Sequence, residues 1–584
     1  MRHIIDIMII ILLVTTSVNS ARERTIEGVR EDTLVLTFSH PTIMKTSIGV
    51  TLLLEEANKY YLEGFKPVLP VHIEVFKFPM GTKILEVELK PRRVSLEKLL
   101  QPLKTPPLPK FSIPLPKSIE STRVFPSEWY SSRIGVGIDN SEHILYLSIA
   151  IFPVRYNISF RGLEILRKCE LMIRYVEEER KIPDIYDLLI ISPGEYREEI
   201  EKLKQHKELE DYRVKIVNIS DIPSIGRDLQ ESIKYFIKQA IEKWGIKYVL
   251  LVGNERFIPS RMVYVEDIRD IFTNRKCFIS DLYYADIYDA NGNFSSWDSN
   301  GNNRFSEYKS WLRKPLDDVD LYPDIYIGRI PCNNREELRI YIDKIISYEN
   351  SNTPPPEWFK RIILVGGDTF TEDISGVEEG EVITAKIAEI MKGFSAEKIW
   401  DSNGKLRHAE DINKAIEKGA GFIAFEGHAG ANSYRTHPHR TRNEWIPVEW
   451  YRTYHIRVLS NDGKLPIVTA DACNICSFSS NYTCFGWAFL SKEDGGGIAT
   501  IGMSSFSWIY PGRFCTEGLG GLIHIKTYEA YQSSENKTLG EIWSKAVIGY
   551  LNSNPWGLSA YDYKTIEAWE LLGDPSLQIP IVKN

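Results

Sequence analysis

Two stretches decide the fold of this chain: FIAFEGHAG at residues 422–430 and LPIVTADACNICSF at residues 465–478. Each begins with a short, continuously apolar run, which is typical of a strand that is buried on both faces of a sheet. We therefore predict strands over residues 421–425 and 465–470. In an open parallel sheet, functional groups collect just beyond the carboxyl ends of the strands. His428 and Cys473 occupy those positions.

The same pattern extends over most of the chain. A charged helix is predicted from Glu195, another over residues 229–244, where an apolar face at 3.6-residue spacing ends at Gly245, and a third near residues 336–348. Apolar runs that predict further strands occupy residues 188–192, 214–218, 248–252, 324–328, 361–365 and 497–501. Alternating strands and helices predict a parallel sheet covered by helices. The proline-rich linker at residues 353–356 divides this region into two consecutive α/β halves, 181–353 and 357–584.

The first part of the chain has a different pattern. From residue 21 to about residue 180 the apolar residues alternate with a period of two, as at residues 71–78 and 84–89. A further strand pair is predicted at residues 144–151 and 171–176, and a proline-rich break covers residues 106–116. We expect a small all-β domain, a sandwich or a barrel, in front of the α/β body.

Composition and the amino terminus limit the classes of function. The 584 residues carry a net charge of -8 without a basic stripe, so a nucleic acid partner is not expected. Residues 1–20 combine Arg2, a short apolar run and small residues, which predicts a cleaved signal peptide and a secreted or cell-surface protein. The apolar run is interrupted by Asp6, and no later run is long enough to cross a bilayer, so we expect no membrane span in the mature form.

His428 and Cys473 together suit nucleophilic catalysis. A thiol becomes a strong nucleophile when a nearby base removes its proton, and the same imidazole can then protonate a leaving amine. The glycines beside His428 allow close approach of a substrate backbone, and the N–H groups of Ala429 and Cys473 are candidate oxyanion donors. The alternative is structural: Cys473 as a small core residue and His428 as a hydrogen-bonded loop histidine.

The sequence segments around His428 and Cys473 resemble those of a known family. FIAFEGHAG, LPIVTADACNICSF, CFGWAFL (484–490), GGGIATIG (495–502) and LLGDPSLQIP (571–580) are similar, in order and spacing, to the catalytic half of gingipain-like cysteine peptidases, of the caspase and legumain clan. The family's Ala-Cys, with Phe five residues after the Cys, is matched by Ala472, Cys473 and Phe478. PVLPVHIEVFKFPMGTK (67–83) resembles the family propeptide, and YIGR (326–329) the end of its first α/β half.

This resemblance implies a caspase-like body and a set of roles. Cys473 is similar to the nucleophile, His428 to the general acid/base, and Asp368 to a carboxylate that orients the histidine. A helix-initiating or loop acid is an equal reading of Asp368. Trp508 resembles a wall of the pocket for the side chain before the scissile bond, where Glu378 and Glu379 match the position of an acid.

The chain departs from the family in two places. The family's His-Gly is His428-Ala429 here, and its Asn-Gly after the cysteine is replaced by Ile475-Cys476. Cys476 is therefore a rival nucleophile, and we prefer Cys473 because it directly follows the strand. The lone CxxC also fits a redox motif, which we set aside because no thioredoxin-like unit surrounds it.

The sequence offers candidate sites for two kinds of metal ion. Asp298, Asn300, Asn302 and Glu307, and separately residues 289, 291 and 293, put oxygen donors on alternate positions of a Gly/Asn-rich loop, which favours a structural calcium ion over a solvated turn. A zinc site formed by His428, His437 and His439 is the weaker alternative, since no HExxH helix accompanies them. Catalysis itself needs no cofactor.

The sequence therefore predicts a secreted cysteine endopeptidase that acts on protein or peptide substrates and is made as a zymogen. By the resemblance, its own propeptide inhibits it until the linker is cut at Arg180 or Lys181, which is equally a solvated hinge. The alternative is a catalytically silent surface or adhesion module with the same fold.

Overall fold

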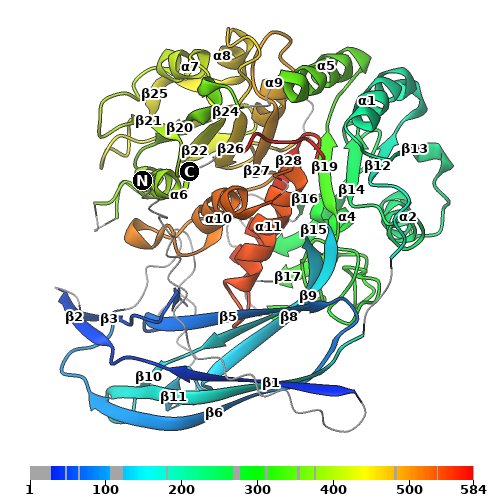
Figure 1. Cartoon of the computed structure of the whole chain (residues 1–584). Helices are drawn as coiled ribbons and strands as arrows, with labels where there is room; N and C mark the ends of the chain where they lie inside the picture. The colour runs from blue at the N-terminus through cyan, green and yellow to red at the C-terminus, as the bar shows by residue number, and fades with distance from the viewer. Residues whose placement is uncertain are drawn as a thin grey trace, which may run out of the picture.

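The computed structural model describes residues 28–46, 49–62, 66–104, 123–178, 182–266, 277–309, 314–351, 355–373, 376–478, 483–535 and 537–582. An all-β domain formed by residues 28–178 lies against one side of an α/β body (Figure 1). The expected signal peptide, the proline-rich break after Lys104 and the expected processing residues Arg180 and Lys181 lie outside the described residues.

The β domain consists of two main sheets and a hairpin. The first sheet contains β1 (Val29–Thr37), β6 (Lys83–Lys98), β7 (Val124–Phe125), β10 (Val154–Asn157) and β11 (Gly162–Val176). The second contains β4 (Lys59–Tyr61), β5 (Leu69–Pro79), β8 (Tyr130–Asp139) and β9 (Glu142–Ile151), and β2 (Thr42–Thr46) pairs with β3 (Gly49–Leu53). The described strand pairs in these sheets are antiparallel, and the domain is a sandwich, one of the two architectures expected.

One detail of the expected β domain is wrong. Residues 144–151 and 171–176 are both strands, but they belong to β9 and β11 in different sheets and do not pair with each other. Leu147 of β9 and Leu171 of β11 are fully buried members of the same core. The two segments thus share apolar contacts across the sandwich, which period-two patterning cannot distinguish from pairing within a sheet.

The body is built on one ten-stranded sheet with the order β13-β12-β14-β19-β28-β27-β26-β22-β20-β21. Its strands are β12 (Leu188–Ser192), β13 (Val214–Asn218), β14 (Tyr248–Val252), β19 (Tyr326–Ile330), β20 (Arg361–Gly366), β21 (Ser395–Trp400), β22 (Phe422–Glu426), β26 (Ile467–Asp471), β27 (Ala499–Met503) and β28 (Trp569–Leu572). The two predicted α/β halves are therefore joined edge to edge. The link is β28, which pairs in parallel with β19 and antiparallel with β27.

Helices cover both faces of this sheet, and their ends follow the sequence signals. They are α1 (Arg197–Leu209), α2 (Leu229–Trp244), α4 (Leu282–Ala285), α5 (Arg335–Ser351), α6 (Glu379–Ile390), α7 (Ala409–Glu417), α8 (Thr453–Arg457), α9 (Phe485–Leu490), α10 (Leu519–Ser533), α11 (Leu539–Asn552) and α12 (Ala560–Glu567). At the start of α2, the Asp228 side chain accepts a hydrogen bond from the Glu231 N–H, and Gly245 ends the helix at a φ of 73°. Among the described residues, no helix is long and apolar enough to cross a membrane.

Two smaller sheets extend from the body. One contains β15 (Arg261–Glu266), β16 (Phe278–Ser280), β17 (Phe305–Lys309) and β18 (Lys314–Pro315). The other is a three-stranded antiparallel sheet of β23 (His428–Gly430), β24 (Ser433–Thr436) and β25 (Ile446–Arg452). The second small sheet continues directly from β22, so it lies at the edge where functional groups are expected.

The β domain is held to the body by buried polar contacts. The Ile138 N–H donates to the Pro323 carbonyl at 2.8 Å, and the Ser148 hydroxyl donates to Asn552 Oδ1 at 2.7 Å. Figure 1 shows α10 and α11 between the large sheet and the sandwich. Both contacts are formed by buried side chains or strands, so the β domain is docked as a folded unit.

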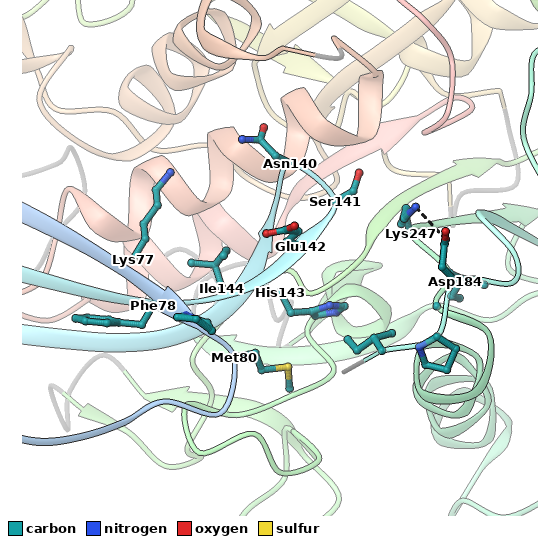
Figure 2. A pocket seen from close by; sticks show the side chains of 15 residues that line it. Lys77, Phe78, Met80, Asn140, Ser141, Glu142, His143, Ile144, Asp184 and Lys247 are labelled. Carbon is teal, nitrogen blue, oxygen red and sulfur yellow. Dashed lines mark hydrogen bonds and ion pairs between the residues drawn. The ribbon is translucent and has the colours of Figure 1, made fainter. Parts of the chain in front are cut away.

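The junction of the two domains contains a cavity of about 710 Å³ (Figure 2). It is bordered by Met80 from the β5–β6 turn, by Ser141 from the β8–β9 hairpin, and by Ile182 and Asp184 from the first residues of the body. Within the body, Lys247 Nζ lies 3.4 Å from Asp184 Oδ1 (Figure 2). The cavity thus lies where the sandwich meets the first described residues of the body, Ile182 to Asp184.

Candidate active site

Two neighbouring strands bring the candidate histidine and cysteine to one edge of the large sheet. β22 and β26 pair in parallel, with Phe425 opposite Ala470 and Glu426 opposite Asp471. His428 and Cys473 each lie two residues beyond this last pair. Because neighbouring strands are about 4.8 Å apart, the chain delivers both side chains to the same rim of the sheet.

A glycine lets the chain turn out of β22 into β23. Gly427 has a φ of +147°, and a Cβ built there would lie 3.0 Å from the Arg435 carbonyl oxygen and 3.0 Å from the Thr436 Cβ. Only glycine readily combines this backbone conformation with such close approach. The turn positions His428 as the first residue of β23, directly opposite Arg435 of β24.

The imidazole of His428 is oriented by a backbone carbonyl. Its Nε2 lies 3.1 Å from the carbonyl oxygen of Thr369, and its ring packs edge-on against Trp445 at a centroid distance of 5.4 Å. A carbonyl oxygen only accepts, so this hydrogen bond assigns the proton of the neutral ring to Nε2. Nδ1 is then the basic nitrogen, which is the arrangement a general base requires.

Asp368 lies beside this histidine, but its carboxylate has other neighbours. Its Oδ2 accepts a hydrogen bond from the Arg440 N–H at 2.8 Å, and its backbone N–H and carbonyl pair with those of His437 at 3.0 and 3.1 Å. Its Oδ1 is buried without a hydrogen-bond partner, and burial raises the pKa of this carboxyl. The carboxylate–imidazole contact that we expected is replaced by the carbonyl of the following residue, Thr369, so Asp368 anchors the loop that orients His428.

The thiol of Cys473 is half-buried and contacts a backbone amide. The Ser507 N–H lies 3.4 Å from Sγ and donates to it, and Sγ is 4.0 Å from the Ser507 carbonyl oxygen. An N–H donor stabilises a thiolate more than a thiol. The loop after β27 therefore contributes to the environment of the predicted nucleophile.

The rival thiol of Cys476 is placed very differently. It is fully buried, and burial raises its pKa well above the ordinary value. Its Sγ packs under Gly486 and Gly502, where added Cβ atoms would lie 3.2 and 3.5 Å away. Such a thiol is inert, because neither a substrate nor a base reaches it. Cys473 and Cys476 form no disulfide.

A buried polar network lies beneath the two candidate catalytic residues. The Ser507 hydroxyl donates to Asp471, and Glu426 Oε1 lies 2.5 Å from His524 Nδ1. Burial raises the pKa of Asp471 to about 7 and that of Glu426 well above its usual range, and it lowers the pKa of His524 to about 3. The network is therefore largely neutral, and it fixes the ends of β22 and β26 and the Ser507 loop relative to one another.

Trp508 follows Ser507 and is nearly buried, with its ring edge-on to Tyr561 at 5.0 Å.

The pocket acids that we expected differ from each other. Glu379 is fully buried, accepts from the backbone N–H groups of Gly512, Thr369 and Phe370 at 2.7, 3.2 and 3.2 Å, and therefore ties two loops together. Burial raises its pKa to about 7.

Glu378 keeps one buried carboxylate oxygen without a hydrogen-bond partner, and its other oxygen lies 3.1 Å from His439 Nδ1. Burial, followed by the neighbouring Glu381, raises the pKa of Glu378 to about 8. Of the two expected pocket acids, Glu378 is thus the one with a carboxylate oxygen that accepts no hydrogen bond.

The β domain contacts the segment that follows Trp508. Arg513 donates to the Thr51 hydroxyl at 3.3 Å, and the buried ammonium of Lys59 lies 3.6 Å from Glu517 Oε2. Burial lowers the pKa of Lys59 to about 8. The loop beside the candidate site is therefore clamped between the β domain and Glu379.

The residues considered for metal sites are engaged by other groups. Asp298 pairs with Arg227 and accepts backbone N–H groups from residues 302 and 303, and Glu307 pairs with Arg304 and Lys309, each at 3.1 Å. Asn302 donates to Glu307, and the Asn300 side-chain oxygen accepts from the Asn302 N–H. These ion pairs compensate the negative charges of the loop without a metal ion. Calcium binding therefore stays a prediction that the geometry does not favour.

The histidines considered for zinc also have protein partners. His437 Nδ1 donates to the Glu444 carbonyl at 2.6 Å, and the His437 ring stacks on Trp445 at 3.7 Å. Across the part of the chain that the structure describes, no group of three or more histidine, cysteine or carboxylate side chains is placed to hold a metal ion.

Comparison with known proteins agrees with this geometry. A model of peptidase family C25 matches residues 182–580, which is most of the chain. The chain belongs to peptidase family C25. The match begins just after the β domain and covers the complete α/β body with both candidate catalytic residues.

Curated relatives of this C25 protein include two gingipains of Porphyromonas gingivalis. Gingipain R2 is 23% identical over 438 residues, which cover 72% of this chain and 50% of the relative, and Lys-gingipain HG66 is 21% identical over 283 residues, 44% of this chain and 15% of the relative. The chain spans half the length or less of these relatives. A crystal structure of the Arg-specific cysteine proteinase gingipain R superposes with a TM-score of 0.50 at 20% identity, covering 68% of this chain and 78% of the other, and shows the shared fold.

Sequence reasoning missed two contributors to the site. Thr369 acts through its carbonyl and Ser507 through its N–H, and no side-chain pattern marks a backbone group. For Ser507 a signal existed, since it directly precedes Trp508, which the family resemblance had already brought to the site.

Proposed function

We propose that this C25 family member is a secreted endopeptidase that hydrolyses peptide bonds with Cys473 as nucleophile and His428 as general acid/base. The pairing of β22 with β26 carries the proposal, because it delivers the thiol and the imidazole to one rim of the sheet. The hydrogen bond between His428 Nε2 and Thr369 supports the role of His428, because it leaves Nδ1 as the basic nitrogen.

The reaction then runs in two halves. His428 Nδ1 takes the proton of the Cys473 thiol, the sulfur attacks the peptide carbonyl carbon, and the C–N bond breaks as the imidazolium returns its proton to the leaving amine. In the second half His428 takes a proton from water, the oxygen attacks the thioester, and the C–S bond breaks as the imidazolium returns that proton to the Cys473 sulfur. The products are an amine and a carboxylic acid, and the enzyme is regenerated.

Backbone groups supply the electrostatics of this mechanism. The Ser507 N–H stabilises the thiolate before attack, and the N–H groups of Ala429 and Cys473 are the proposed donors to the oxyanion. Donors fixed in the backbone need no reorganisation during the reaction. Trp508 is the proposed wall of the pocket for the side chain before the scissile bond, with Glu378 as its acid.

We further propose that the chain is made as a zymogen whose β domain is an inhibitory propeptide. The contacts of Thr51 with Arg513 and of Lys59 with Glu517 support this, because they clamp the loop that follows Trp508. Cleavage at Arg180 or Lys181 would begin the release of the β domain.

Replacing Cys473 tests the proposal. Cys473→Ala is expected to abolish peptide hydrolysis and to accumulate as an uncut chain, whereas the wild type acquires an amino terminus near residue 181, measured by mass spectrometry. Cys476→Ala is the matched control: its thiol is buried three residues away, so the variant retains activity. Activity in Cys473→Ala would refute the nucleophile, and a processed wild type that cleaves no peptide would favour a silent surface module.

A further inference from the structure

The small sheet that carries His428 has a second feature, two arginines stacked on tryptophans. The guanidinium of Arg435 lies 3.7 Å from the ring centroid of Trp445 and 3.8 Å from that of Trp450, and the guanidinium of Arg452 lies 4.6 Å from Trp450. All four side chains are half-buried. We call these four residues the Arg–Trp ledge.

Strand register places the ledge on the same face as the catalytic candidate. Arg435 is directly opposite His428, and Arg452 is opposite Ser433, two residues from Arg435 on the same strand. Alternate residues of a strand share a face, so His428, Arg435 and Arg452 point to one side of this sheet. The Cβ atoms of a directly opposite pair are about 5 Å apart.

The other face of the small sheet faces the core. Tyr434 and Tyr451 are fully buried and pack against Phe425 of β22, with ring centroids 4.9 and 6.1 Å apart. The ledge therefore belongs to the face that looks away from the large sheet. It forms a continuation of the surface on which His428 is presented.

Neither Arg435 nor Arg452 forms an ion pair with an acidic residue in the described parts of the chain. The pKa of Arg435 is lowered by burial and by the neighbouring Arg452, with no carboxylate among its causes. Half-buried arginines are ordinarily paired, because removing a charge from water is costly. Two adjacent cations held on aromatic planes are thus a preorganised site for an anion.

The backbone of the ledge is strained. Trp450 has a φ of +56°, a left-handed conformation that is an outlier for a bulky residue, and the register between β24 and β25 shifts beside it. This conformation sets the ring that stacks on both arginines. Strain of this kind is concentrated at functional sites, where the surrounding fold maintains it.

We propose that the Arg–Trp ledge is a substrate subsite that binds an acidic side chain on the leaving side of the scissile bond. This proposal rests on the peptidase function above. His428 protonates the leaving amine, so the peptide that departs with that amine passes over His428 and its neighbours. The next side chains on that face are Arg435 and Arg452, and a planar carboxylate fits a guanidinium fork through two hydrogen bonds.

Paired peptides test the subsite. Two substrates differ only in one residue shortly after the scissile bond, Glu in one and its uncharged isostere Gln in the other. The wild-type chain, processed normally, is expected to cleave the Glu peptide with a kcat/KM roughly tenfold higher, as expected for charge-assisted hydrogen bonds. In Arg435→Gln this ratio falls to about one, and in Arg452→Gln it falls partly.

Arg457→Gln is the matched control, since Arg457 is an exposed arginine at the end of α8 and is not one of the four ledge residues. Its Glu-to-Gln ratio stays that of the wild type. Thermal unfolding checks that each variant is folded, and Arg435→Lys keeps the charge without the fork and is expected to recover part of the preference. A wild-type ratio near one, or a ratio unchanged in Arg435→Gln, overturns the subsite while leaving the peptidase function in place.

A binding measurement separates the two proposals. Two fluorescently labelled peptides correspond to the leaving product, one with Glu and one with Gln near its amino terminus. Each is titrated with the wild type and with Arg435→Gln, and the fluorescence anisotropy is recorded. Preferential binding of the Glu peptide that is lost in Arg435→Gln supports the ledge even in a chain that cleaves nothing. Equal binding of both peptides contradicts it, whatever the activity.

Discussion

At the scale of single residues, the basic nitrogen of His428 is selected by a carbonyl. The Thr369 oxygen accepts from Nε2, which leaves Nδ1 as the nitrogen that we propose to exchange protons with Cys473. A carbonyl accomplishes this without a buried negative charge beside the imidazole. Asp368 acts on His428 only indirectly, through the loop that carries Thr369. Its carboxylate accepts a hydrogen bond from the Arg440 N–H, and its backbone pairs with that of His437.

Asp368→Asn tests whether His428 is oriented by the Thr369 carbonyl or by direct contact with the Asp368 carboxylate. Asparagine retains an oxygen that accepts from the Arg440 N–H, and it replaces a buried unpartnered oxygen with an amide group. We therefore expect kcat/KM to stay within a few-fold of the wild type. In a triad in which the carboxylate contacts the imidazole, the same substitution lowers kcat by about 10⁴. A loss of that size in steady-state kinetics would restore Asp368 to a direct role.

The sequence reveals side-chain chemistry at this scale but not backbone chemistry. Cys473 was preferred to Cys476 because it directly follows a strand, and the burial of Cys476 gives the physical reason. Glu378 and Glu379 looked equivalent as neighbouring acids. Only the fold shows that Glu379 accepts hydrogen bonds from three backbone N–H groups, because one of them, that of Gly512, is 133 residues away in the sequence.

At the scale of elements, the decisive feature is the turn from β22 into β23. It bends the chain sharply after Glu426, so that His428 enters a small antiparallel sheet at the rim of the large parallel one. The turn depends on Gly427, whose positive φ and crowded surroundings exclude a side chain.

Gly427→Ala is expected to displace His428 and to lower activity more than tenfold, at a cost in stability of about 1–3 kcal/mol from the left-handed strain and the two contacts at 3.0 Å. Gly430→Ala is the control on the same short strand, because its Cβ would meet only Ser433 Oγ at an ordinary 3.7 Å. Activity assays and thermal unfolding compare the two. Equal effects of the two substitutions would argue against a special role for the turn.

The elements that sequence predicted well are those buried on both faces. β22 and β26 were predicted within two residues at each end, because every position in them is apolar or buried. β21 was missed because it is an edge strand in which the polar residues Ser395, Glu397 and Lys398 break the apolar pattern. β28 was missed because it is only four residues long.

At the scale of the whole molecule, the sequence predicted an all-β domain before two α/β halves, since period two and period 3.6 separate cleanly along the chain. It did not predict that the halves share one sheet. That union depends on β28 from the carboxyl end pairing with β19 from the first half. Pairing between segments so far apart leaves no local signature in the sequence.

The docking of the β domain yields a prediction about latency. Gly135 of β8 faces Tyr322 of the body, and an added Cβ would lie 2.1 Å from the ring. Gly135→Ala is expected to loosen this interface, so that the cut β domain separates and activity appears several-fold faster. Ser132→Ala, on an exposed position of the same strand, is the control. Unchanged rates of separation, followed by size-exclusion chromatography, would place the inhibitory contact elsewhere.

The central claim is that His428 activates the thiol of Cys473. The most direct test is the rate of alkylation of each cysteine by iodoacetamide, resolved by peptide mass spectrometry, in the processed wild type and in a His428→Ala chain cut at the same linker. The account predicts that Cys473 reacts fastest by far at pH 6.5, that Cys476 is inert, and that His428→Ala slows Cys473 by at least an order of magnitude. Alkylation of Cys473 at the same rate with and without the imidazole would contradict it.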